Sequence, residues 1–378
     1  MIYLDNAATT ALRPEVIEKM TESLKNNFGN ASSTHAPGRA SRAIIEQCRK
    51  NIASYFKASA SEIIFTSGGT EADNLALRSS VRDLGVKEII TTKAEHHAVL
   101  YTAQQLEKEY DIKVTYVDLK CDSCLDYDHL EMLLKTEGKK LVSLMHINNE
   151  VGTILDLERV SQLCTAHKAL FHTDTVQSIG HYDLDLSNIN IDFLAASAHK
   201  FHGPKGVGFC YIRKETGIKP LIFGGEQERG QRAGTECIHN IVGMDEALRM
   251  AYQNMEFEQA YVKDLKHHFI TSLKSQIPEI QFNGACATTD KSTYTLVNIG
   301  LPISPEKAAM LQFQLDLKGI ACSKGSACQS GSVEASHVLR AFQDEELLKK
   351  PTVRFSFSIY NTNEELDRVV AVLKDLCC

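Results

Sequence analysis

Apolar and polar positions follow two different rhythms over the first two thirds of the chain. Short runs rich in β-branched and apolar residues, such as 62–67 (EIIFTS), 88–92 (EIITT) and 141–147 (LVSLMHI), are each followed by a helix-like stretch. The first pattern is typical of buried strands and the second of amphipathic helices. Because strand and helix alternate over residues 62–213, the sequence predicts parallel βαβ units.

The pattern changes after about residue 240. Residues 240–277 are mostly helical in pattern and end at Pro278, and two strand-like and two helix-like segments follow. Thr362 and Glu365 have the spacing of a capping box at the start of the last helix. We therefore predict a large α/β domain (15–255) and a smaller α+β domain (1–14 and 256–378) that carries a loop at about 321–333.

Length and composition agree with an ordinary globular protein. A chain of 378 residues is too long for one common core, and 43% hydrophobic with 24% charged residues lies in the globular range. Acidic and basic residues are mixed and the net charge is -7, which argues against a nucleic-acid groove. No apolar run reaches membrane-spanning length, so we expect neither a nucleic-acid partner nor a membrane.

Eleven cysteines occur without an export signal, since Asp5 interrupts the apolar start. A cytoplasmic location with reduced thiols is the resulting expectation. Cys121 and Cys124 have CxxC spacing, but no second pair of ligands follows at comparable spacing. We therefore expect no metal site.

Lys200 stands where a predicted strand (FLAAS) meets a turn-rich segment. Ligands bind at such strand ends in parallel sheets, and a lysine held there can have its pKa lowered enough to attack an aldehyde. The alternative is an ordinary solvated lysine.

Other polar residues fall at neighbouring strand ends. Gly69 and Thr70 lie in a turn between strand and helix, where backbone N–H groups can approach a phosphate. Asp174 ends a strand and Gln177 follows it, which suits the ring nitrogen and the hydroxyl of a pyridine cofactor. His96 can stack on an aromatic ring or move protons.

Two further residues are candidates for substrate binding. Asn149 follows a predicted strand and can bond a substrate or cofactor oxygen, and Arg340 lies on a short, otherwise apolar helix. A guanidinium suits bidentate binding of a carboxylate. The alternative for Arg340 is a side chain that extends from the helix into solvent.

Residues 322–331 form a small, polar, glycine-bearing loop with Cys328 inside it. A cysteine on such a loop, with a lysine and backbone amides nearby, can exist partly as thiolate. Cys328 could then attack sulfur and hold it as a persulfide. The alternative is a free thiol in a loop.

Taken together and in this order, the motifs resemble those of the cysteine desulfurases, fold-type I pyridoxal-phosphate enzymes of the class V aminotransferase group. The resemblance extends over nearly the whole chain and rests on YLDNAATT, SGGTEADN, EHHAV, NNEVGT, HTDTVQS, SAHKFHGPKG, RAGTE, GSAC and SHVLRA. It implies a mostly parallel sheet flanked by helices, with a smaller α+β domain.

The resemblance also implies roles for particular residues. Lys200 would form the Schiff base with pyridoxal 5'-phosphate, and Asn149 and Arg340 would hold the substrate carboxylate. The remaining cofactor contacts would come from Gly69, Thr70, His96, Asp174, Gln177, Ser197, His199 and, across a homodimer with shared active sites, Thr235.

The implied reaction is removal of sulfur from L-cysteine, which leaves L-alanine and a Cys328 persulfide. Lys200 and His96 would move protons, and an acceptor protein, such as an iron–sulfur scaffold, would receive the sulfur. A selenocysteine lyase, a class V aminotransferase and a non-catalytic sulfur-binding scaffold are the alternatives.

Overall fold

The computed structural model of the chain describes residues 1–214, 216–304, 308, 310–325 and 336–377. A seven-stranded sheet in the order β2-β8-β7-β6-β5-β3-β4 forms the centre of its larger part. All neighbours in this sheet are parallel except those of β8, which is antiparallel to β2 and β7. Its strands are β2 (Ile63–Thr66), β3 (Glu88–Thr91), β4 (Lys113–Tyr116), β5 (Lys140–Ser143), β6 (Leu170–Asp174), β7 (Phe193–Ser197) and β8 (Gly208–Ile212).

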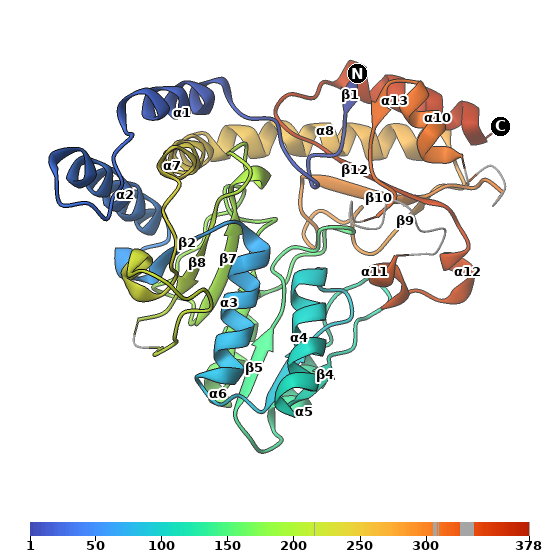
Figure 1. The fold of residues 1–378 in the computed structure, drawn as a ribbon. Helices are drawn as coiled ribbons and strands as arrows, with labels where there is room; N and C mark the ends of the chain where they lie inside the picture. Colours follow the sequence, from blue (N-terminus) through green and yellow to red (C-terminus); the bar gives the residue numbers. More distant parts are fainter. Residues whose placement is uncertain (215, 305–307, 309, 326–335, 378) are drawn as a thin grey trace.

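Helices cover both faces of this sheet, because successive strand residues point to opposite sides. Phe193 and Ala195 pack with α3 and α4, whereas Leu194 and Ala196 belong to a cluster with α1, α2, α5, α6 and α7. The layers are visible in Figure 1. The helices are α1 (Pro14–Asn26), α2 (Ala36–Tyr55), α3 (Gly69–Arg82), α4 (His97–Tyr110), α5 (Tyr127–Leu134), α6 (Leu157–Ala166) and α7 (Ile238–Gln253). The predicted α/β fold with a mostly parallel sheet is therefore confirmed.

A second hydrophobic cluster lies around α8 (Met255–Gln276) and α13 (Asn363–Cys377). It includes Ile2 and Leu4 from the start of the chain. Its strands form a three-stranded antiparallel sheet, β12-β10-β9, and a parallel pair, β1-β11. The bounds are β1 (Ile2–Tyr3), β9 (Gln281–Phe282), β10 (Leu296–Gly300), α10 (Leu311–Leu317), β11 (Ile320–Ala321), α11 (His337–Arg340), α12 (Glu345–Leu348) and β12 (Thr352–Ser356).

We propose that the clusters on the two faces of the central sheet form the core of one domain and that the cluster around α8 and α13 forms the core of another. The predicted helical connection consists of two helices, α7 and α8, that meet at Asn254, whose φ of -107° breaks the helix. The predicted capping box of α13 is present, because the Thr362 hydroxyl accepts from the Glu365 N–H and the Glu365 carboxylate accepts from the Thr362 N–H. None of the helices among the described residues combines the length and the apolar character of a membrane span.

Candidate functional site

A cavity of about 250 Å³ lies at the carboxyl ends of the central strands. Parallel strands place the residues that follow them at one edge of the sheet, which is where ligands of such folds bind. Nine of the residues predicted for the site line this cavity: Gly69, Thr70, His96, Asn149, Asp174, Gln177, Ser197, His199 and Lys200. The structure therefore brings together side chains that the sequence separates by more than a hundred positions.

Lys200 is half-buried at the cavity wall, in a short 3-10 turn after β7. Its Nζ donates to the backbone oxygens of Ala7 at 2.6 Å and Ala8 at 2.9 Å. The N-terminal segment thus forms the part of the cavity wall next to the lysine amine, and its two carbonyl oxygens hold the amine in place. This carbonyl pair was not predicted, since nothing in the local sequence around Lys200 points to residues 7 and 8.

Asp174 ends β6 and is buried, as its place at the strand end predicts. Burial raises the pKa of its carboxyl to about 6, while the Val176 N–H, which donates to Oδ1 at 2.9 Å, and the Lys200 charge oppose this rise. Because burial disfavours the lone charge, the site favours a cationic group in front of Asp174. A protonated ring nitrogen is such a group.

His96 forms the N-cap of α4, and its Nδ1 accepts from the Ala98 N–H at 3.1 Å. Burial, together with the charges of Lys200 and His337, lowers its pKa to about 4. The imidazole is therefore neutral near pH 7, and its proton lies on Nε2 because Nδ1 is an acceptor. A neutral ring can stack on an aromatic cofactor and donate one hydrogen bond from Nε2.

The start of α3 supplies a place for an anion. Gly69 and Thr70 begin this 14-residue helix at the cavity, so the first N–H groups of the helix are available there. A Cβ on Gly69 would lie 2.5 Å from Cγ2 of Val176, so glycine is required for this approach. Together with the hydroxyl of Ser197, which lines the same cavity, this geometry suits a phosphate.

His199 and Gln177 meet the N-terminal segment as well. His199 Nδ1 lies 3.2 Å from the Thr9 hydroxyl, and burial with the charges of Lys200 and Lys205 lowers the pKa of His199 to about 4. Gln177 Nε2 donates to the Ala7 oxygen at 3.0 Å. An amide donor here fits the hydroxyl of a pyridine ring, and a neutral imidazole can donate to a phosphate.

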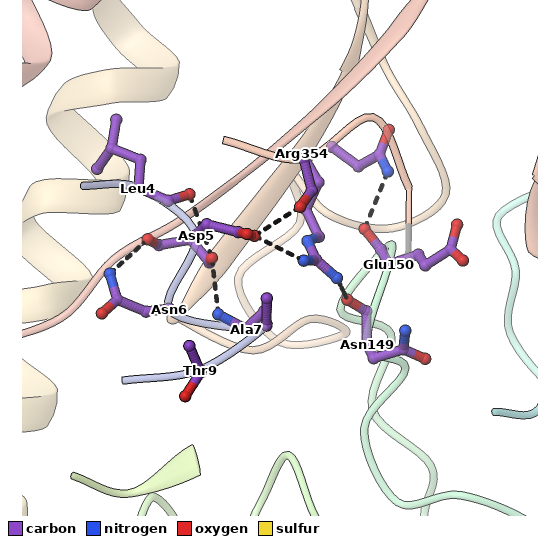
Figure 2. Close-up of polar contacts among 12 residues, drawn as sticks. Leu4, Asp5, Asn6, Ala7, Thr9, Asn149, Glu150 and Arg354 are labelled. Atoms are coloured by element: carbon purple, nitrogen blue, oxygen red, sulfur yellow. Dashed lines mark hydrogen bonds and ion pairs between the residues drawn. The ribbon is translucent and has the colours of Figure 1, made fainter. Parts of the chain in front are cut away.

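Arg354 is a cavity residue that the sequence did not reveal. It lies in β12 with only 1% of its side chain exposed, and its Nη1 donates to the Asn149 oxygen at 2.7 Å (Figure 2). Its Nε and the Oδ1 of Asn149 are buried and have no hydrogen-bond partner among the described residues. A signal for it exists in the sequence, since a charged residue inside the apolar run TVRFSF must be paired when buried.

Asp73 is a second residue that was not predicted. Its carboxyl is fully buried in the cavity wall, 3.3 Å from His172 Nε2, and burial with the nearby charges of Asp174 and Glu95 raises its pKa. Asp73 therefore holds a proton more readily than an ordinary aspartate. Its place one helical turn after the start of α3 accounts for its position at the cavity.

Two predicted residues that the structure describes are not among those that line the cavity. Arg340 is exposed at the end of α11, and Thr235 is exposed in the segment before α7. Cys328 lies outside the described residues. The predicted roles of these residues stay predictions. Cys322 is described, and burial raises the pKa of its thiol to about 12, so it is protonated near pH 7.

Similarity to known proteins agrees with this geometry. The model of the family described as aminotransferase class-V matches residues 2–369. A cysteine desulfurase IscS of Dictyoglomus turgidum is 41% identical over 375 residues, covering 99% of this chain and 93% of the relative. A putative cysteine desulfurase IscS 1 of Bacillus subtilis is 40% identical over 379 residues, with 99% and 98% covered.

Solved structures are similar over the same length. A NifS-like protein superposes with a TM-score of 0.90 at 33% identity, covering 99% of this chain and 98% of that one. A structure described as SspA in complex with cysteine gives a TM-score of 0.79 at 30% identity, with 96% and 100% covered. The chain therefore belongs to the class V aminotransferase family.

Proposed function

We propose that the protein is a pyridoxal-phosphate-dependent cysteine desulfurase, which converts L-cysteine to L-alanine and an enzyme persulfide. The observation that supports this most strongly is Lys200 Nζ at the wall of a cavity whose other sides carry Asp174, His96 and the start of α3. The names of relatives about 40% identical over nearly the full chain support the same reaction.

The residues present fit the proposed cofactor. Lys200 would hold its aldehyde carbon, Asp174 its ring nitrogen and Gln177 its hydroxyl, while Thr70, Ser197 and His199 would receive its phosphate. When bound, pyridoxal 5'-phosphate supplies an aldehyde that condenses with amines and a ring that withdraws electrons from the substrate.

Side chains of the protein stabilise charge and move protons during the proposed reaction. Burial keeps water from the Asp174 carboxylate, which lets it stabilise a positive charge in front of it. Once the substrate amine has replaced it, the Lys200 amine can take the proton from the substrate Cα. It can then give this proton to another atom of the substrate. Neutral His96 donates a hydrogen bond from Nε2 toward the reacting groups.

Arg354 is better placed than Arg340 to hold the substrate carboxylate. It lines the cavity, its Nε is buried without a partner among the described residues, and Asn149 lies beside it. A guanidinium binds a carboxylate through two parallel N–H bonds. We therefore assign this role to Arg354 and Asn149 and no longer to Arg340.

Cys328 is the proposed sulfur acceptor. Its thiolate would attack the substrate sulfur, the C–S bond would break, and its electron pair would stay with carbon, which takes up the thiol proton. The products are alanine and a persulfide on Cys328. A homodimer in which Thr235 reaches the partner's cofactor, and an acceptor protein for the sulfur, complete the proposal.

The test uses Cys328→Ser with Cys121→Ser, an exposed cysteine away from the cavity, as the matched control. We expect Cys328→Ser to keep the absorption band of the bound cofactor and to lose persulfide formation by at least about a hundredfold. Mass spectrometry after one turnover locates the persulfide, and alanine is measured in parallel.

Full sulfur transfer by Cys328→Ser would contradict the assigned acceptor. If alanine is released faster from L-selenocysteine than from L-cysteine, the protein is a selenocysteine lyase instead. A protein that shows no absorption band after addition of the cofactor would be a sulfur-binding scaffold.

A further inference from the structure

The carboxylate of Asp5 joins two segments that are more than 300 positions away in the sequence. Its Oδ1 accepts from the Ser323 hydroxyl at 2.8 Å. The same oxygen accepts from Arg354 Nη2 at 2.8 Å (Figure 2). The Asp5 side chain is 19% exposed and that of Arg354 is 1% exposed. Since buried ion pairs are weakly screened by water, this contact has a strong effect on where the guanidinium lies.

The main chain around Asp5 is fixed on both sides. Ile2 and Tyr3 pair with Ile320 and Ala321, and Asp5 forms a bridge with Ser356. Two residues later, the Ala7 oxygen accepts from Lys200. Asp5 therefore lies on a short segment that connects the β1-β11 pair to the catalytic lysine.

Ser323 and Arg354 are also joined through their backbones. The Arg354 N–H donates to the Ser323 oxygen at 2.7 Å, and the Ser323 N–H donates to the Arg354 oxygen at 3.3 Å. The shared Asp5 oxygen adds a side-chain link to this backbone pair. Ser323 also stands five positions before Cys328 in the sequence.

The contacts of Arg354 leave one edge of its guanidinium for a ligand. Nη2 is held by Asp5 and Nη1 by the Asn149 oxygen, while Nε is buried without a partner among the described residues. A long arginine side chain has many rotamers, and ordering it costs conformational entropy. Two fixed acceptors order the side chain before the substrate arrives, so the guanidinium is already held in place at the cavity that Arg354 lines.

We propose that Asp5 is a positioning residue that sets the preference of the site for a substrate carboxylate. The Oδ1 of Asp5 orients the Arg354 guanidinium. Through Ser323 it also fixes the position of β12, the strand that carries Arg354. This inference rests on the proposed function, because it takes an α-amino acid as the ligand of Arg354.

The experiment compares Asp5→Asn with Asp122→Asn in the cofactor-loaded enzyme. Asp122 also forms an ion pair, with Lys291 at 2.9 Å, but it lies outside the cavity. Calorimetry measures the Kd of L-alanine and of L-alaninamide, in which a neutral amide replaces the carboxylate. We expect Asp5→Asn to weaken L-alanine binding about tenfold and L-alaninamide binding about twofold or less, because only the carboxylate uses the charge of Arg354.

Kinetics with L-cysteine give a second measurement. Asp5→Asn should raise KM about tenfold while kcat changes less than about threefold, because the interaction is present in both the bound substrate and the transition state. Ser323→Ala should shift the L-alanine Kd in the same direction by about threefold. Asp122→Asn should match the wild type.

The outcomes separate this inference from the proposed function. Wild-type protein that releases no alanine from L-cysteine contradicts the proposed function and this inference with it. An active wild type whose preference for L-alanine over L-alaninamide is unchanged in Asp5→Asn contradicts the role of Asp5 alone. If Asp5→Asn does not fold, Ser323→Ala decides, and an unchanged L-alanine Kd in that variant overturns the proposal.

Discussion

Arg354 and Arg340 show how far a single residue can be assigned from the sequence. The family resemblance implied that Arg340 holds the substrate carboxylate, whereas its place on an apolar helix alone favoured a side chain that extends into solvent. In the structure Arg340 is exposed at the end of α11. Arg354 interrupts an apolar strand, which is the same signal in a different element. The sequence alone cannot distinguish them, since the choice depends on which element meets the cavity.

We expect Arg354→Lys to raise KM for L-cysteine about tenfold or more, because an ammonium cannot form the paired N–H bonds of a guanidinium. Steady-state kinetics with L-cysteine provide the measurement. Arg78→Lys is the matched control, because Arg78 forms an ion pair with Glu109 at 2.6 Å away from the cavity. If Arg340→Lys raises KM instead while Arg354→Lys does not, the original prediction is correct.

Residues at strand ends were predicted well for a physical reason. Asp174, Ser197 and Lys200 each follow a buried apolar run, and parallel strands bring such ends to one edge. The contacts of Ala7 and Ala8 with Lys200 were not predictable in this way. They depend on tertiary packing between segments almost two hundred positions apart.

At the scale of elements, the junction of β2 and α3 determines the proposed phosphate site. Gly68 has a φ of +152°, a backbone conformation that favours glycine, and its place between strand and helix lets α3 begin at the cavity. The sequence TSGGTE predicted this turn correctly. It did not predict that Val176, from the segment after β6, would pack against Gly69.

Gly69→Ala should weaken binding of pyridoxal 5'-phosphate about tenfold or more, because its Cβ would lie 2.5 Å from Val176 and displace the start of α3. Equilibrium dialysis with absorbance detection gives the Kd. Gly300→Ala is the control, since a Cβ there meets its nearest atoms at 3.5 Å, an ordinary contact. Unchanged cofactor affinity in Gly69→Ala would show that the close approach is not needed.

At the scale of the whole molecule, buried histidines set the response to acid. Burial lowers the pKa of five of them to about 3 or 4, namely His96, His146, His172, His199 and His202. The unfolded chain, with pKa values near 6.5, therefore binds more protons than the folded one between pH 6.5 and 4. Five carboxyls with raised pKa act in the opposite direction, namely those of Asp73, Glu95, Asp174, Asp192 and Asp245.

The pKa values of His97 and His181 are lowered as well, so seven histidines oppose five carboxyls. The free energy of unfolding should therefore fall as pH falls from 6.5 toward 4, by about 1 kcal/mol or more per pH unit. Urea unfolding at a series of pH values gives the slope. His146→Gln should make the slope shallower, since it removes a histidine whose pKa is lowered to about 4 by burial. Exposed His267 supplies the control, His267→Gln, and equal slopes in the two variants would contradict the role of burial.

The sequence predicted two domains because the helical stretch at residues 240–277 separates two different strand patterns. The exception is the N-terminal segment. Ile2 and Leu4 belong to the cluster around α8 and α13, although Val16 already belongs to the other cluster. The short segment of residues 1–14 carries too little periodic signal to show this crossing.

The pairing of Asp5 with Ser356 and of Ile2 with Ile320 has a consequence for synthesis on the ribosome. The first residues to be synthesised cannot form their native strand pairs until the strands around residues 320 and 356 have been synthesised. Until then, the carbonyls of Ala7 and Ala8 have no fixed place from which to hold Lys200. The central sheet can therefore form early in translation, whereas a working active site is among the last parts of the molecule to be completed.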